Sequence, residues 1–276
     1  MLSLGPVIMN RNQQSADKTL SDNKEKSQLR SKPLAYDAYQ RLAEAYAEKA
    51  DTKPHNAYYD RPAMLSLLPD LAGLKVLDVG CGPGAYAEEL AIRGATVSAC
   101  DMSEKMLEQA NLRINKAIAQ GRVEPNQIEF HHLDLTQPLT MFQDSSYDLV
   151  NAPLCLDYIE DWTTLFCEFN KKLKPGGMLL FSAGHPASDA EYFKTKKYFE
   201  VEQVQATWTG FGIRVLMPSF RRSMAEVFNP VINAGFVLDH VLEPKPTSDF
   251  EKADLRRYKS LMHRPVFVCV RAVKPD

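Results

Sequence analysis

The sequence lacks the features that tie a protein to a membrane or a metal. No apolar run approaches the ~20 residues that cross a bilayer, and residues 1–9 lack the charged start and long apolar stretch of a signal peptide. The five cysteines form no C-x-x-C pair, and the neighbours His131 and His132 point to opposite faces of an expected strand. We therefore expect no metal site and no membrane partner, and we place the protein in the cytoplasm.

A large positive charge is also missing. The formal net charge is −2, whereas a protein held to DNA or RNA mainly by phosphate contacts needs a basic face. The chain of 276 residues has 45% hydrophobic and 25% charged residues and no internal repeat, which is ordinary for a globular protein. A chain of this length buries roughly 70% of its unfolded surface without a disulfide or metal. We expect no nucleic-acid partner, and a homodimer is left open.

The N-terminal quarter divides into two parts. Residues 1–33 are largely polar and offer little to bury, so we expect a disordered tail. In residues 34–72, Tyr39, Leu42 and Tyr46 recur at three- and four-residue steps and predict one face of a helix. A second short helix is expected around Pro62, which suits a first helical turn. We interpret residues 34–72 as a helical lid.

Short apolar runs alternate with helical segments from Lys75 onward. Seven strands are expected, at residues 75–79, 96–100, 128–131, 147–151, 178–182, 236–242 and 265–273. Pro175-Gly176-Gly177 is expected to stop the helix before the fifth strand. This alternation predicts an α/β fold with a doubly wound, mostly parallel seven-stranded sheet and right-handed crossovers. We assign residues 73–184 to its core and residues 223–276 to its C-terminal part, with a Pro-rich loop before the last strand.

The strand–helix rhythm breaks in residues 185–222. This segment is rich in aromatic side chains: Tyr192, Phe193, Tyr198, Phe199, Trp208, Phe211 and Phe220. We interpret it as a cap inserted after the fifth strand, over the strand ends. Its aromatic residues form either an apolar ligand pocket or the core of the cap itself.

A glycine loop joins the first strand to the first helix of the sheet. Gly80, Gly82 and Gly84 stand at alternate positions, where they permit tight turns and let a ligand approach the main chain. Such a loop at the carboxyl end of a strand faces the ligand crevice of an open α/β sheet. Dinucleotide, phosphate and nucleoside binders all use one, so the loop alone does not identify the ligand.

Three acids narrow the choice of ligand. Asp78 precedes the first glycine, where its carboxylate can receive a cationic amine. Asp101 ends the second strand and can accept two hydroxyls of a ribose, and Asp134 follows the third strand and can accept from an adenine amino group. The adjacent apolar residues Met102 and Leu135 can sandwich an adenine ring. The pattern therefore favours an adenosine-containing ligand that carries an amine.

The run Val76–Gly84 resembles the first motif of class I S-adenosylmethionine-dependent methyltransferases. The similarity extends over residues 36–182 and includes Asp101-Met102-Ser103 with Met106-Leu107, Asp134-Leu135, Tyr147-Asp148-Leu149-Val150 and Leu173-Lys174-Pro175-Gly176-Gly177. The wider pattern is similar to the small-molecule branch that includes the quinone-biosynthesis enzymes. This resemblance implies the Rossmann-like methyltransferase fold, S-adenosylmethionine as cofactor and S-adenosylhomocysteine as its product.

The resemblance also implies a set of cofactor-binding residues. These are Tyr46, Asp78, Gly80, Cys81, Gly82, Gly84, Asp101, Met102, Met106, Asp134, Leu135 and Asn151. Asp78 would sit near the amino group, Asp101 would hold the ribose hydroxyls, and Asp134 and Leu135 would contact the adenine. Asn151 would lie near the methionine part, and Tyr46 resembles a residue that closes over the cofactor.

Three candidates for catalysis follow the fourth and fifth strands. His185 should project into the crevice, where an imidazole can deprotonate a hydroxyl at neutral pH; alternatively it hydrogen-bonds locally and orders the cap. Asp157 and Tyr158 lie in the region that faces the acceptor in similar enzymes. Alternatively, Asp157 caps a helix and Tyr158 packs in the core. The reaction expected is an in-line displacement, to which positioning contributes much of the catalysis.

Two other functions stay open at this point. An NAD-dependent oxidoreductase would also suit an acid at Asp101, although Asp78 and the Lys174–Gly177 turn favour the methyltransferase. A non-catalytic adenosine-ligand-binding protein would have no need for Asp78, the glycine loop and Asp101 together. The run Asn151-Ala152-Pro153-Leu154 only partly matches the signature of methyltransferases for nucleic-acid amino groups. We therefore expect a small-molecule substrate of partly aromatic or apolar character, with O- or C-methylation favoured over N-methylation.

Overall fold

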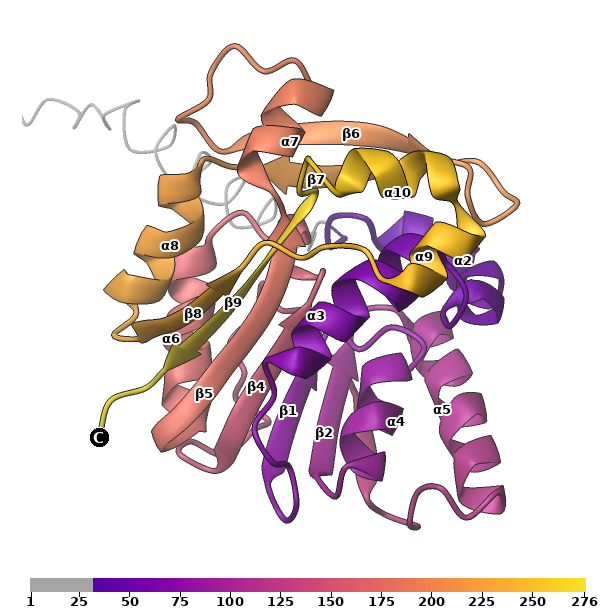
Figure 1. The fold of residues 1–276 in the computed structure, drawn as a ribbon. Helices are drawn as coiled ribbons and strands as arrows, with labels where there is room; N and C mark the ends of the chain where they lie inside the picture. The colour runs from indigo at the N-terminus through magenta and orange to yellow at the C-terminus, as the bar shows by residue number, and fades with distance from the viewer. Residues whose placement is uncertain (1–31) are drawn as a thin grey trace, which may run out of the picture. The chain divides into compact units, whose positions relative to one another are not determined.

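The computed structural model describes residues 32–276 (Figure 1). Almost all of the tail expected at residues 1–33 lies outside the described residues. The strands of the main sheet are β1 (Lys75–Val79), β2 (Thr96–Asp101), β3 (Ile128–His132), β4 (Tyr147–Pro153), β5 (Leu173–Gly184), β8 (Val237–Leu242) and β9 (Phe267–Val273). The helices around them are α2 (Tyr36–Lys49), α3 (Arg61–Ser66), α4 (Ala85–Ile92), α5 (Glu104–Ala119), α6 (Trp162–Lys172), α8 (Met224–Asn233), α9 (Ser248–Ala253) and α10 (Leu255–Leu261).

Seven strands form one sheet in the order β3-β2-β1-β4-β5-β9-β8. The pairs from β3 to β5 are parallel, and the pairs β5–β9 and β9–β8 are antiparallel. The doubly wound, mostly parallel seven-stranded sheet expected from the sequence is thus confirmed. The chain runs outward from β1 to β3 and then returns to β4 on the other side of β1. The carboxyl ends of β1 and β4 therefore flank the switch point at which open α/β sheets bind ligands.

Two hydrophobic cores cover the two faces of the sheet. Neighbouring residues of a strand point to opposite faces, and in β1 Val76 packs with the core of α3, α4 and α5, whereas Leu77 packs with the core of α6 and α8. Figure 1 shows these two groups of helices on opposite faces. Residues 76–79 of β1 are all buried, which explains the nearly continuous apolar run of a parallel strand covered on both sides.

Two local expectations from the sequence were wrong. The fifth strand begins at Leu173 rather than Met178, because Gly176 takes up a φ of +72° and its N–H donates to Lys274 O (2.9 Å), which joins the Pro-Gly-Gly turn to the end of β9. The loop expected before the last strand contains α9 and α10. The Asp254 carboxylate caps α10 by accepting from Arg257 N (3.0 Å), and the ring of Phe250 in α9 is fully buried.

Residues 34–72 and 185–222 flank the carboxyl edge of the sheet. The first segment holds α2 and then a π-helix, η1 (Asn56–Asp60), that runs directly into α3. The second holds α7 (Pro186–Tyr192) and a hairpin of β6 (Glu202–Trp208) and β7 (Val215–Arg221), which forms a sheet of its own. Leu42 of α2 and Met217 of β7 belong to one small apolar cluster. The two segments therefore pack against each other above the strand ends.

Replacing Phe166 with alanine should strongly destabilise the fold. Its ring is fully buried in the α6 side of the core, 5.3 Å from the ring of Phe181, and removing such a ring costs about 3–5 kcal/mol. Phe199→Ala is the matched control, because that ring is 83% exposed and its loss should change the free energy of unfolding by less than about 0.5 kcal/mol. Urea unfolding followed by circular dichroism measures both; similar losses in the two variants would contradict this assignment of the core.

Candidate active site

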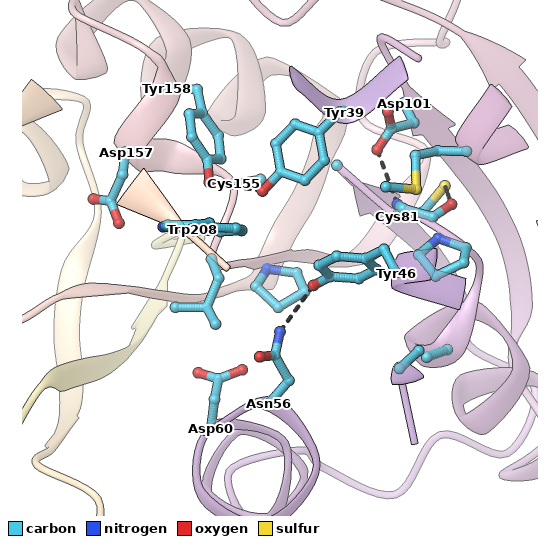
Figure 2. Close-up of a pocket in the computed structure, with 18 of the residues that line it drawn as sticks. Tyr39, Tyr46, Asn56, Asp60, Cys81, Asp101, Cys155, Asp157, Tyr158 and Trp208 are labelled. Carbon is cyan, nitrogen blue, oxygen red and sulfur yellow. Dashed lines mark hydrogen bonds between the residues drawn. The ribbon is translucent and has the colours of Figure 1, made fainter. Parts of the chain in front are cut away.

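A cavity of about 590 Å³ opens at the carboxyl edge of the sheet, beside the switch point. Figure 2 shows side chains that enter it from the lid, the glycine loop, the segment after β4 and the cap. Its lining includes these residues singled out in the sequence: Tyr46, Gly80, Cys81, Gly82, Asp101, Met102, Met106, Asp134, Leu135, Asp157 and Tyr158. Asp78, Gly84, Asn151 and His185 are not among the residues that line it.

The glycine loop presents bare backbone to this cavity. Gly80, Gly82 and Gly84 all have φ between +53° and +79°, where a side chain would be strained. A Cβ at Gly80 would lie 2.3 Å from the Cβ of Cys155, whereas a Cβ at Gly82 would meet nothing within 4 Å. Packing therefore requires glycine at position 80, and Gly82 leaves space in which a ligand can approach the main chain.

Asp101 joins the glycine loop to the start of α5. Its Oδ2 accepts from Gly82 N (2.9 Å), and its Oδ1 accepts from Ser103 N (2.8 Å). Ser103 in turn caps α5 by accepting from Met106 N (3.2 Å). Burial raises the pKa of Asp101, and the backbone donors oppose that rise. Each carboxylate oxygen uses one lone pair on the backbone, so both can still accept a hydroxyl from the cavity.

Asp78 and Asn151 form a buried pair at the ends of β1 and β4. Asn151 Nδ2 donates to Asp78 Oδ1 (2.7 Å), and the two residues face each other in the parallel register. Asp78 Oδ2 and Asn151 Oδ1 have no hydrogen-bond partner within residues 32–276. Burial raises the pKa of Asp78 to about 7. Two unpaired acceptors buried at the switch point fit a ligand that brings N–H donors, such as an amine.

Asp134 and Leu135 line the cavity on the side of β3. The Asp134 carboxylate accepts from Thr136 N (2.9 Å) and Thr136 Oγ1 (2.8 Å), which fixes it in a local turn. Met102 and the buried Met106 line the same cavity. This combination of apolar side chains with an anchored carboxylate suits a purine ring that carries an amino group.

Aromatic rings line a second part of the cavity. Tyr46 stacks on Phe211, with 4.8 Å between the ring centroids, and its hydroxyl accepts from Asn56 Nδ2 (2.8 Å). Tyr39 shares a hydrogen bond with the Tyr158 hydroxyl (2.7 Å) and lies edge-on to Trp208. We call this group the aromatic chamber: Tyr39, Tyr46, Tyr158, Trp208 and Phe211. Burial raises the pKa of Tyr46 to about 12, so its hydroxyl stays neutral at physiological pH.

The backbone is strained where β4 gives way to the cavity. Leu154 lines the cavity and has a φ of +50°, which costs a non-glycine residue roughly 1–2 kcal/mol. Its N–H donates to Ser182 O (3.0 Å) at the end of β5, which holds it in this conformation. The strain turns the following residues, including Asp157 and Tyr158, away from the direction of the strand and into the cavity.

The position of His185 gives no support to the general-base role expected for it. Its Nδ1 accepts from Ala187 N (3.3 Å) and caps α7, and its Nε2 shares a hydrogen bond with Glu243 Oε1 (2.7 Å). Both ring nitrogens are therefore occupied, away from the cavity lining, which agrees with local ordering of the cap. Asp157 does line the cavity, where its Oδ2 accepts from Gly184 N (3.0 Å), and burial raises its pKa.

The lining also includes residues that were not recognised in the sequence, among them Asn56, Asp60 and Arg61. Asp60 has helical φ and ψ where η1 runs into α3, so it caps no helix start, and its Oδ2 accepts from the Tyr86 hydroxyl (2.9 Å). Asp60 Oδ1 and Arg61 Nε lack partners in the described part of the chain. An aspartate before a helix start is ordinary capping composition. The sequence therefore carries no signal that this side chain turns inward.

Comparison with known proteins gives one sequence relative over most of the chain and others over a shorter part of it. Residues 77–181 match a family described as a methyltransferase domain. An uncharacterized protein of Haemophilus influenzae is 28% identical over 257 residues, covering 87% of this chain and 94% of that protein. Ubiquinone biosynthesis O-methyltransferase of Idiomarina loihiensis is 38% identical over 112 residues, covering 41% of this chain and 43% of that enzyme. This second match spans less than half of the enzyme's length.

Solved structures share the fold. An S-adenosylmethionine dependent methyltransferase from Mesorhizobium loti has a TM-score of 0.61 at 26% identity, covering 82% of this chain and all of that one. The N-methyltransferase NodS from Bradyrhizobium japonicum, solved with S-adenosylhomocysteine, has a TM-score of 0.58 at 19% identity and covers 88% of this chain. The second likeness concerns the fold alone. The Rossmann-like methyltransferase fold is thus confirmed.

In residues 32–276, no group of three His, Cys, Asp or Glu side chains is arranged to hold a metal ion, and none of the helices combines the length and apolar character needed to cross a bilayer. Of the two adjacent histidines, His132 hydrogen-bonds Met102 O through Nε2 (2.9 Å), whereas His131 lies edge-on to Phe142.

Asp78→Asn should stabilise the protein at pH 8 and have little effect at pH 4. The carboxyl has a pKa of about 7 when folded but near 3.9 when unfolded, so its ionised form costs the fold up to about 4 kcal/mol above pH 7. This cost disappears as the pH falls toward 4, and the neutral amide avoids it throughout. Chemical unfolding at both pH values measures the difference. Glu108→Gln, on the exposed face of α5, is the control; an Asp78→Asn gain of equal size at both pH values would contradict the assignment.

Proposed function

We propose that this chain, a class I S-adenosylmethionine-dependent methyltransferase, methylates a small molecule with a partly aromatic or apolar body. The observation that carries the proposal is the composition of its cavity. One part is built from the glycine loop and Asp101, and another part is the aromatic chamber. A nucleoside cofactor and an apolar acceptor thus have adjoining places in one cavity.

The cofactor part offers the donors and acceptors that S-adenosylmethionine needs. We assign Asp101 to the ribose hydroxyls and the unpaired oxygens of Asp78 and Asn151 to the amino group, directly or through water. The free Nε of Arg61 suits the carboxylate of the methionine part, and Asp134 suits the adenine amino group. The other residues assigned to cofactor contact are Tyr46, Gly80, Cys81, Gly82, Gly84, Met102, Met106 and Leu135.

Positioning and exclusion of water are the tasks left to the protein. When bound, S-adenosylmethionine supplies a methyl group on a positively charged sulfonium, which needs no covalent catalysis from the chain. Tyr46 from the lid and Phe211 from the cap stack over the cavity, and Lys53 Nζ donates to Gly210 O (3.2 Å). These contacts join lid to cap and hold an acceptor in one orientation, which converts a bimolecular step into an effectively unimolecular one.

The sequence relatives support an acceptor that is methylated at an oxygen atom. The central 112 residues resemble a ubiquinone biosynthesis O-methyltransferase, whose name states transfer of a methyl group to oxygen. The chamber of Tyr39, Tyr158 and Trp208 is suited to a flat apolar body. Methylation at oxygen is therefore favoured, and methylation at carbon is the second choice. The aromatic contacts would be the same for both reactions.

Calorimetric titration with S-adenosylhomocysteine tests the cofactor assignment. The wild type should bind it in the micromolar range and should not bind NAD, and Asp101→Ala should weaken binding roughly 30- to 100-fold because ribose hydroxyls lose a charged acceptor. Glu108→Ala, on the exposed face of α5, should leave the affinity unchanged. Circular dichroism checks that Asp101→Ala is folded, since Asp101 also orders the glycine loop. Tighter binding of NAD than of the homocysteine product would contradict the proposal.

A further inference from the structure

We propose that Asp60 is the base of this reaction, and that the methyl acceptor presents a protic group, a hydroxyl or an amine, to its free oxygen. The inference rests on the proposed function, because it concerns the acceptor part of the same cavity. It replaces the role that the sequence suggested for His185, which points elsewhere, and it restricts the acceptor to molecules that carry an O–H or N–H beside an aromatic or apolar body.

Asp60 combines nearly complete burial with an unused acceptor atom. Its side chain is 1% exposed, its Oδ2 accepts from the Tyr86 hydroxyl (2.9 Å), and its Oδ1 has no hydrogen-bond partner in the described residues. The Ser182 hydroxyl lowers the pKa of this carboxyl by hydrogen bonding to it, while the Ser182 oxygen itself accepts from Leu154 N (3.2 Å). An unpaired buried acceptor costs about 1–3 kcal/mol. A ligand that supplies the missing donor removes that cost.

The backbone directs Asp60 into the cavity. The carboxyl belongs to the last residue of the π-helix Asn56–Asp60, a rare conformation that is frequent at functional sites. Asp60 has helical φ and ψ (−67° and −56°), and Arg61 N donates to Asn56 O within the helix, so the Asp60 side chain has no helix start to cap. Figure 2 shows Asp60 and Asn56 projecting from this helix toward the side of the cavity that holds Tyr46 and Trp208. The Asp60 carboxyl therefore lies on the side of the cavity that holds the aromatic chamber.

The basic side chains of the cavity do not neutralise Asp60 by direct pairing. Their polar contacts are Arg61 Nη1 to Asp51 Oδ1 (3.1 Å), Lys53 Nζ to Gly210 O (3.2 Å) and Arg257 Nη1 to Asp254 Oδ2 (3.5 Å). His55, which also lines the cavity, has its pKa lowered to about 4 by burial and is neutral at physiological pH. None of these basic groups is hydrogen-bonded to Asp60 Oδ1, which keeps acceptor capacity for a donor on a bound molecule.

Asp157 is the rival carboxylate of the cavity. It already accepts from Gly184 N (3.0 Å), and the charge of the nearby Arg222 stabilises its ionised form. The hydroxyls of Tyr39 and Tyr158 bond to each other, and burial raises the pKa of both, so both stay protonated at physiological pH and cannot take up a proton. Asp60 is more deeply buried than Asp157, and its Oδ1 is buried without a hydrogen-bond partner in the described residues. Asp157 is the residue against which Asp60 has to be tested.

The proposed step moves one proton and one methyl group. The acceptor O–H or N–H donates to Asp60 Oδ1, and its proton passes to this oxygen while the lone pair of the heteroatom forms the new bond to the methyl carbon. The carbon–sulfur bond breaks and its electron pair stays on sulfur, which leaves S-adenosylhomocysteine. Asp60 then returns the proton to solvent. Burial raises the pKa of Asp60 to about 6, so the carboxylate is ionised at neutral pH and is a stronger base than an exposed aspartate.

Binding of three matched probes tests the assignment without knowledge of the natural acceptor. The probes are 4-methylphenol, 4-methylaniline and 4-methylanisole, which share a ring and differ in whether they carry a proton donor. Ligand-detected NMR titrations are made on the protein saturated with S-adenosylhomocysteine. At least one protic probe should bind roughly tenfold or more tightly than the anisole, because the anisole leaves Asp60 Oδ1 unpaired.

Asp60→Asn should reduce this preference to about twofold or less. The Tyr86 hydroxyl keeps the amide oxygen, so the amide nitrogen, a donor, faces the probe. Asp157→Asn is the matched variant of the rival carboxylate, and Glu108→Gln on the exposed face of α5 is the distant control; both should keep the wild-type preference. Unchanged affinity of Asp60→Asn for S-adenosylhomocysteine shows that the variant is folded and that Asp60 does not serve the cofactor.

Four results would overturn the inference. They are no saturable binding of any probe, equal binding of protic and aprotic probes, loss of the preference in Asp157→Asn rather than Asp60→Asn, and a tenfold loss of S-adenosylhomocysteine affinity in Asp60→Asn with the preference intact. All four leave the proposed function standing. Failure of the wild type to bind S-adenosylhomocysteine, measured first, would instead contradict the proposed function itself.

Discussion

The site depends on the parallel pairing of β1 with β4. A hydrogen bond from Asn151 Nδ2 to Asp78 Oδ1 joins the ends of these two strands. The chain leaves β1 toward one side of the sheet and leaves β4 toward the other, so the two strand ends cannot be covered by a single crossover. The glycine loop starts at one of these ends and the strained Leu154 follows the other. The cavity is therefore a consequence of the strand order, and the buried pair joins the two strand ends without lining the cavity.

The unsatisfied polar groups of the molecule gather at this edge. Of the buried side-chain atoms that lack partners within residues 32–276, those of Asp60, Arg61, Asp78 and Asn151 lie in or just below the cavity. These unpaired atoms cost free energy of folding. The burial of apolar side chains in the cores on both faces of the sheet, which are continuous from β1 to β9, offsets this cost. Arg222 Nε is the further such atom, away from the cavity lining, so within the described residues most of the unused side-chain hydrogen-bonding capacity lies where a ligand can supply the missing partners.

Lid and cap decide what the site can accept. Solved structures that are 19% and 26% identical share the fold over 88% and 82% of this chain. The aromatic chamber is assembled from α2, the segment after β4 and the β6–β7 hairpin, and the small cluster that contains Leu42 and Met217 holds these pieces together. Apart from Tyr46, which we assign to both parts, the chamber is built on elements other than the glycine loop, so variation in these segments can change the acceptor.

The sequence by itself determined the strands, the helices between them, the glycine loop and the acids Asp78, Asp101 and Asp134, because apolar periodicity and loop chemistry are local properties of the chain. It misjudged the start of β5 and missed α9 and α10, where backbone bonding and burial override turn residues such as Gly176 and the prolines. Only the tertiary structure decided the acceptor part. Tyr39 meets Tyr158 across 119 positions and Lys53 meets Gly210 across 157, and no periodicity encodes such contacts. The same holds for Asp60: an aspartate before Pro62 is ordinary capping composition, but Asp60 lies inside a continuous helix and its side chain lines the cavity.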